Sequence, residues 1–139
     1  MKTLLTALAT WGACRGTKWY LDRSSRKESS FLGGRIKLTA LWNRGAAFGL
    51  PIGRKWLPVL SGAALTALLT QRKRHPIAAG LILGGGLSNL QERVEQEAVY
   101  DYIRFPKAPG ALKRYVYNLA DLAVFAGALG LLWAGKKKD

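Results

Sequence analysis

The chain has 139 residues, enough for one compact domain, and 49% of them are apolar although 22% are charged. Its formal net charge of +14 suits a partner with negative charge, either nucleic acid or anionic lipid. Cys14 is the only cysteine, so the sequence offers neither a disulfide framework nor a thiolate metal cluster, and we expect no metal and no cofactor.

Apolar stretches alternate with strongly basic segments, a pattern typical of membrane spans. The stretches cover residues 4–14, 56–69, 76–90 and 116–134. A helix needs ~20 residues to cross a hydrocarbon core, and only the last stretch nearly reaches that length. The first stretch reaches it by including Arg15 and Lys18, whose long stems can extend to the lipid headgroups. A soluble helical bundle is the alternative.

The first predicted helix covers about residues 3–21. Its beginning, MKTLLTALATWGAC, also resembles a cleaved export signal. Trp11 stands three residues before Cys14, where the signal of a lipoprotein carries a branched apolar residue, and Arg15 follows at once. These residues favour a first helix that is retained.

Strand-like sequence follows at about residues 31–55 and predicts a small extramembrane β platform between the first and second helices. Within it, IKLTALWN at residues 36–43 is typical of a short strand. The second helix is predicted over residues 56–70, with Pro58 near its first turn, where proline is tolerated. The third covers residues 76–93, after the basic turn QRKRHP.

The second and third helices contain GAALTALL and AAGLILGGGLSNL, which are apolar around the whole helix and rich in small residues that suit close packing in lipid. A loop with proline and glycine, FPKAPGALKR, precedes a fourth helix over about residues 117–134. The sequence therefore predicts an all-α membrane protein with four transmembrane helices and the small β platform, in a single integral membrane domain over residues 1–139.

An even number of spans places both termini on one side of the membrane, together with the QRKRHP turn. That side carries its bases in short clusters, whereas the opposite side carries more of them over longer loops. Since short clusters beside helix ends carry the stronger signal, we expect both termini in the cytoplasm. The bases flank apolar runs and do not line one helix face, and no nucleic-acid motif occurs, so we expect lipid and no nucleic acid.

Two acids stand out because of their surroundings. Asp121 lies in the apolar fourth helix, where an unpaired carboxylate is costly, and Asp101 lies among aromatic residues in AVYDYIRF. The loop between them can turn and bring both carboxylates together. Such a pair shares one proton, so that one member activates water, while the other hydrogen-bonds the carbonyl oxygen of a peptide and later assists the leaving amine. Alternatively, Asp121 caps the fourth helix or pairs with Arg114, and Asp101 is a solvated loop acid.

Four sequence blocks occur in the order found in one known family. They are NRGAAFGL at 43–50, GGGLSNLQERV at 84–94, AVYDYI at 98–103 and YNLAD at 117–121. In this order they resemble the N-x-G-A-A-F, G-N-x-x-D-R, V-V-D-F-I and F-N-x-A-D boxes of the lipoprotein signal peptidases (signal peptidase II). Thr17 and Lys18 are similar to a Thr-Lys pair at the end of that family's first helix.

The resemblance implies an intramembrane aspartic endopeptidase of the bacterial inner (cytoplasmic) membrane. Such an enzyme cleaves the signal peptide of prolipoproteins before the diacylglyceryl-modified cysteine. The resemblance implies that Asp101 and Asp121 are the catalytic residues. It also implies four substrate-binding residues, namely Asn43, Asn89, Arg93 and Asn118. We expect prolipoproteins and membrane lipids as partners, and a monomer.

The chain departs from the family pattern close to these residues. Glu92 stands where the family has aspartate, Ser88 replaces a glycine, and Tyr100 and Tyr102 replace apolar or phenylalanine positions. These departures concern the positioning of the substrate more than the two acids. The competing interpretations are a non-catalytic membrane paralogue that binds lipidated chains or a partner protein, and a basic module that binds nucleic acid or the ribosome.

Overall fold

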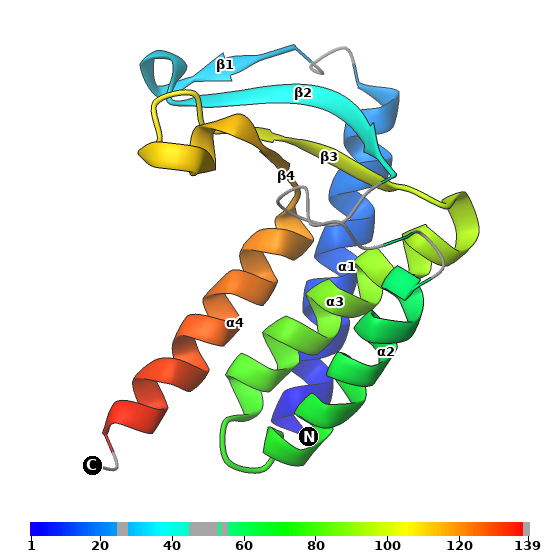
Figure 1. Ribbon diagram of the computed structural model, residues 1–139, viewed down its shortest axis with the longest axis vertical. Coiled ribbons are helices and arrows are strands. Elements are labelled where there is room, and N and C mark those ends of the chain that lie inside the picture. The colour runs from blue at the N-terminus through cyan, green and yellow to red at the C-terminus, as the bar shows by residue number, and fades with distance from the viewer. Residues whose placement is uncertain (25–27, 45–52, 54–55, 138–139) are drawn as a thin grey trace.

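The computed structural model describes residues 1–24, 28–44, 53 and 56–137. The described α-helices are α1 (Lys2–Arg23), α2 (Trp56–Leu68), α3 (Pro76–Gln96) and α4 (Leu119–Lys136). The described strands are β1 (Ser30–Phe31), β2 (Ile36–Asn43), β3 (Val99–Arg104) and β4 (Val116–Tyr117). Short 3₁₀ helices are η1 (Leu32–Gly34), η3 (Leu69–Gln71) and η4 (Gly110–Arg114). The sheet lies across one end of the helices, and both termini lie at the other end (Figure 1).

The four predicted helices are present, with ends shifted by a few residues. The fourth begins at Leu119 and not at residue 117, because residues 116–117 pair as β4 and Asn118 is the N-cap. At the opposite end of the bundle, the hydroxyl of Thr3 donates to the carbonyl oxygen of Arg72 at 3.1 Å. The start of α1 therefore lies beside the turn between α2 and α3, as the alternating direction of successive predicted spans requires.

The sheet is antiparallel in the order β1-β2-β3-β4. The predicted strand IKLTALWN is β2, with the same bounds. The prediction that the platform comes only from the segment between the first two helices is wrong, because β3 and β4 come from the segment between α3 and α4. A strand satisfies its backbone by pairing at long range, which a local pattern does not reveal. Residues 45–52 and 54–55 of the predicted platform lie outside the described residues.

One irregularity in the sheet decides which residues share a face. Ile103 pairs with Leu38, but Asp101 pairs with Leu41, so β2 holds one extra residue over this interval. Such a bulge reverses the alternation of faces beyond it. As a result Asn43, which pairs with Val99, lies on the same face as Leu41 and Asp101.

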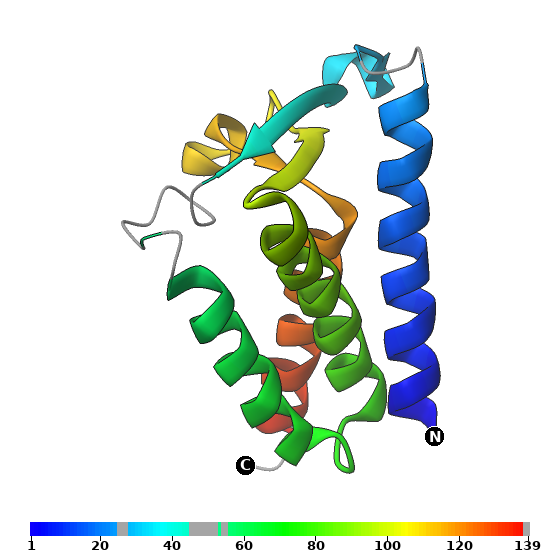
Figure 2. The ribbon, with the colours of Figure 1, turned by 90° about the vertical axis from the view of Figure 1, so that its right-hand side faces the viewer.

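Helix α3 lies between α1 and α2 and also packs against α4 (Figure 2). Its contacts with α1 and α4 depend on glycine. A Cβ atom on Gly84 would lie 2.4 Å from the carbonyl oxygen of Ala7, and one on Gly85 would lie 2.7 Å from that of Ala120. The predicted close packing through small residues is confirmed at these contacts, where backbone meets backbone.

Large apolar side chains are exposed on all four α-helices. They include Leu4, Leu5, Leu8 and Trp19 of α1, Trp56, Val59 and Leu60 of α2, Ile77, Leu87 and Val94 of α3, and Leu122, Phe125, Leu129, Leu132 and Trp133 of α4. Within the described part of the chain, α4 alone is long and apolar enough to cross a membrane by itself. That finding supports one of the four predicted spans.

We expect Gly84→Ala to lower the free energy of unfolding by about 1–3 kcal/mol, because the added methyl group meets the backbone of α1 and the two helices must separate. Gly12→Ala is the matched control, since a Cβ there meets nothing within 4 Å and a better helix former replaces glycine. Denaturant unfolding in detergent, followed through tryptophan fluorescence, measures both. Equal stabilities of the two variants would contradict the packing described here.

Candidate active site

A cleft of about 1190 Å³ lies between the sheet and α4. The two acids singled out by the sequence, Asp101 and Asp121, both line it. Three of the four predicted substrate-binding residues, Asn43, Asn89 and Arg93, line it as well. The structure therefore brings together residues from β2, α3, β3 and α4 that lie far apart in the sequence.

The first turn of α4 fixes the carboxylate of Asp121. The side-chain oxygen of Asn118, the N-cap, accepts from the Asp121 backbone N–H at 2.9 Å, and Oδ2 of Asp121 accepts from the Asn118 backbone N–H at 2.9 Å. This reciprocal capping box satisfies two backbone donors at the helix start. The other oxygen, Oδ1, accepts from Nδ2 of Asn89 at 3.0 Å. The alternative that Asp121 caps the helix is thus correct, and the same residue also faces the cleft.

Asp101 lies on β3 and is only 3% exposed, so the alternative that it is a solvated loop acid is wrong. Its Oδ1 accepts from Nδ2 of Asn118 at 2.9 Å, and its Oδ2 accepts from Nδ2 of Asn43 at 3.2 Å. Each of the two carboxylates therefore accepts one N–H on each oxygen, which fixes both rotamers.

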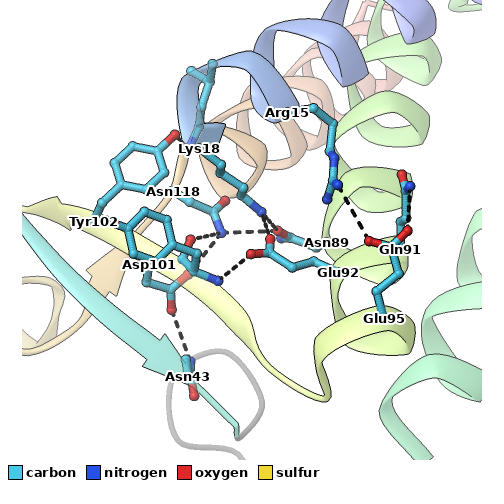
Figure 3. Close-up of polar contacts among 12 residues, drawn as sticks. Arg15, Lys18, Asn43, Asn89, Gln91, Glu92, Glu95, Asp101, Tyr102 and Asn118 are labelled. Atoms are coloured by element: carbon cyan, nitrogen blue, oxygen red, sulfur yellow. Dashed lines mark hydrogen bonds and ion pairs between the residues drawn. The ribbon is translucent and has the colours of Figure 1, made fainter. Parts of the chain in front are cut away.

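The Asn118 side chain is fully buried and its amide nitrogen donates to Asp101 (Figure 3), while its oxygen accepts from the Asp121 backbone N–H. Besides Asp101, its amide nitrogen approaches Oδ1 of Asn89 at 3.1 Å and the carbonyl oxygen of Tyr100 at 3.4 Å. Since Asn118 has no exposed surface and is not part of the cleft wall, the prediction that it binds substrate directly is not supported. Its contacts position the two acids instead.

A buried ion pair lies behind this amide network. The ammonium of Lys18 pairs with Oε2 of Glu92 and also donates to Oδ1 of Asn89 at 3.3 Å, as Figure 3 shows. Oε1 of Glu92 accepts from the Tyr100 backbone N–H at 3.0 Å, which joins the end of α3 to β3. Because Oδ1 of Asn89 accepts from Lys18, its nitrogen is turned toward Asp121.

The expectation that Lys18 extends to the lipid headgroups is wrong, because its residue is 6% exposed and points into the protein. Lys18 and Glu92 are not among the site residues predicted from the sequence, although Lys18 belongs to the Thr-Lys pair and Glu92 is one of the departures from the family pattern. The available signal was that both are charged residues within the segments that resemble the family, Lys18 in the Thr-Lys pair and Glu92 in GGGLSNLQERV. Arg15, the other base of this stretch, pairs with Glu95 near the surface at 3.5 Å.

The pKa of the Asp101 carboxyl is raised from its ordinary value to about 7. Burial is the main cause, and the nearby carboxylate of Asp121 raises this pKa further. The hydrogen bonds from Asn43 and Asn118 and the charge of Lys18 act in the opposite direction. Near neutral pH the carboxyl group of Asp101 can therefore hold or release a proton with little cost in free energy.

Comparison with known proteins decides the family. The family described as Signal peptidase (SPase) II matches residues 6–135. This chain belongs to the signal peptidase II family. It is 38% identical over 120 residues to a lipoprotein signal peptidase of Syntrophomonas wolfei, covering 81% of this chain and 74% of that protein. For the lipoprotein signal peptidase of Methylorubrum extorquens the identity is 36% over 102 residues, which cover 66% of this chain and 58% of that protein.

The fold agrees with this membership. The solved structure of a bacterial membrane enzyme, determined by the in meso method at 2.3 Å resolution, superimposes with a TM-score of 0.83. That match covers 97% of this chain and 87% of the other at 22% identity. A second such structure gives a TM-score of 0.79. The likeness shows that this chain has the fold of a bacterial membrane enzyme.

We expect Lys18→Met to lower the free energy of unfolding by about 3–5 kcal/mol, because it leaves Glu92 as an unpaired buried charge. Adding Glu92→Gln should restore most of that loss, since the amide is neutral and its oxygen can still accept from Tyr100. Arg15→Met is the control and should lower the free energy of unfolding by less than about 1 kcal/mol, because the ion pair of Arg15 with Glu95 is partly exposed. A double variant no more stable than Lys18→Met alone would contradict this account.

Proposed function

We propose that this chain is an aspartic endopeptidase that cleaves the signal peptide of prolipoproteins before the diacylglyceryl-modified cysteine. Family membership supports a signal peptidase, and the names of the relatives, lipoprotein signal peptidases, support lipoprotein precursors as substrates. One observation supports the aspartic mechanism most directly. Two carboxylates from different elements line one cleft, and each is fixed by two N–H donors.

In this mechanism Asp101 begins as the acid and Asp121 as the base. With a pKa of about 7, Asp101 retains its proton beside the ionised Asp121 and hydrogen-bonds the carbonyl oxygen of the peptide to be cut. Asp121 takes a proton from water as the water oxygen attacks the carbonyl carbon. The proton then passes to the leaving amine, and the peptide C–N bond breaks. Both acids return to their starting states after the products leave.

Arg93 and the two cleft-lining asparagines are the proposed substrate contacts. The amide nitrogens of Asn43 and Asn89 already donate to the acids, so the main role of these two asparagines is to orient the carboxylates. Arg93 offers several donors in the same cleft and can bind a backbone carbonyl of the substrate.

The proposed location is the bacterial inner membrane, with four spans and both termini in the cytoplasm. Exposed apolar side chains on every α-helix support insertion of the whole bundle, which argues against a soluble helical bundle. Glycine-mediated contacts support the same conclusion, since helices in lipid associate through close packing. The sheet then lies at the outer surface, where the cleft can receive a substrate held in the membrane. A monomeric state stays a prediction.

We expect Asp101→Asn and Asp121→Asn each to reduce cleavage of a lipid-modified prolipoprotein by at least ~10³-fold, because neither amide can exchange the required proton. Asp22→Asn, at an exposed acid near the end of α1, is the control and should retain activity. The assay follows cleavage by purified protein in detergent micelles. Full cleavage by either active-site variant would favour the non-catalytic paralogue and a contaminating peptidase.

The pH dependence of kcat/KM tests the assignment of the acid. Since Asp101 must be protonated, kcat/KM should fall as pH rises through about 7. The hydrogen bond from Asn43 lowers this pKa, so Asn43→Ala should raise it and move the descending limb to higher pH. Lys37→Gln, at an exposed base on the same sheet, should leave the limb in place. A limb that moves to lower pH in Asn43→Ala would overturn the assignment.

A further inference from the structure

The cleft has a cationic mouth and an apolar wall. Arg35, Lys107 and Arg114 line it on the side of the sheet, and all three are exposed. Leu122 and Phe125 line it along α4. Among the described lining residues, the acids are the two proposed catalytic ones, and Asp101 is almost fully buried. The mouth therefore carries a local excess of positive charge.

The backbone around the mouth holds one of these bases, Lys107, in place. The ammonium of Lys107 donates to the carbonyl oxygen of Gly33 at 2.9 Å, which ties the loop after β3 to the turn between β1 and β2. Three consecutive residues of that turn have positive φ, namely Leu32 at 52°, Gly33 at 65° and Gly34 at 82°. A positive φ is unusual for leucine. This left-handed turn is followed at once by Arg35.

The proposed reaction does not require the positive charge at the mouth of the cleft. The diacylglyceryl group on a prolipoprotein cysteine is uncharged, and peptide hydrolysis by two carboxylates needs no cation at the mouth. A phosphodiester beside two acyl chains matches the cleft better, because the phosphate is attracted by the bases and the chains can lie along α4. Nucleic acid fits less well, since it has no apolar part for this wall.

We propose that an anionic glycerophospholipid binds in this cleft, with its phosphate between Arg35, Lys107 and Arg114 and its acyl chains against α4. The bound lipid occupies the space that a lipid-modified substrate needs, so it competes with the prolipoprotein. The competition rests on the proposed function, whereas the binding itself does not. A membrane rich in anionic lipid therefore raises the apparent KM and leaves kcat unchanged.

Direct binding is tested first. The purified protein in neutral detergent is titrated with phosphatidylglycerol or with phosphatidylcholine of the same acyl chains, and bound lipid is counted by native mass spectrometry. We expect at least about tenfold tighter binding of phosphatidylglycerol, since one base near an anionic headgroup contributes roughly fivefold in affinity. Added salt should reduce the difference. Equal affinities would overturn the proposal, and so would equal binding of glycerophosphoglycerol, which has the same phosphate and no acyl chains.

A matched pair of triple variants locates the site. One removes the three bases at the mouth, as Arg35→Gln, Lys107→Gln and Arg114→Gln. The other removes the same charge from exposed bases that do not line the cleft, as Lys37→Gln, Arg104→Gln and Lys113→Gln. Only the first should lose the preference for phosphatidylglycerol. Equal loss in both would show attraction by net charge alone and would overturn a site in the cleft.

Kinetics separates the failure of this proposal from the failure of the proposed function. Prolipoprotein cleavage is measured in micelles with a rising fraction of phosphatidylglycerol. We expect the apparent KM to rise severalfold for the wild type and for the control triple variant, and to stay constant for the mouth variant. Lipid binding without any cleavage would refute the peptidase and keep the lipid site. Cleavage with an apparent KM that does not change with the fraction of phosphatidylglycerol would refute the competition but not the peptidase activity.

Discussion

The site depends on one buried side chain, that of Asn118. Its oxygen caps the first turn of α4 and its nitrogen donates to Asp101, so a single planar amide joins the two acids. Because the side chain is fully buried, no water can replace either bond when it is lost. The same side chain therefore caps α4 and binds Asp101, so the rigid first turn of α4 also fixes the position of Asp101 on the sheet.

Burial of the polar network costs free energy, and the buried apolar cluster that packs beside it is small. The buried apolar cluster beside the site consists of Leu21, Tyr100 and Tyr102, with Leu119 packed against it. The hydroxyl of Tyr102 accepts from the Leu119 backbone N–H at 3.0 Å and satisfies another donor of the α4 start. Glycine contacts hold α3 close to α1 and α4. Lys18 of α1 can therefore reach Glu92 and Asn89 of α3.

Much of this arrangement was predictable from the sequence because it depends on local patterns. Four helices and β2 follow from apolar runs and strand-like residues, and Asp101 and Asp121 stand out as acids in apolar surroundings. The pairing of β3 with β2 was missed, since it joins residues far apart in the chain. The inward direction of Lys18 was missed for a similar reason. Its partner on α3 decides between an interior and a headgroup position, and no property of α1 alone reveals that partner.

The bulge in β2 has a consequence for how this strand can evolve. If the present sequence of β2 paired regularly from Leu38 onward, Trp42 would lie opposite Val99 in place of Asn43 and would face the cleft. A bulky indole would then stand where an amide now donates to Asp101. Deletion of one residue at Thr39 or Ala40 would remove the bulge and would still leave Leu41 opposite Asp101 and Asn43 opposite Val99. The bulge therefore lets β2 hold one residue more than β3 over this interval without moving Asn43 away from Asp101.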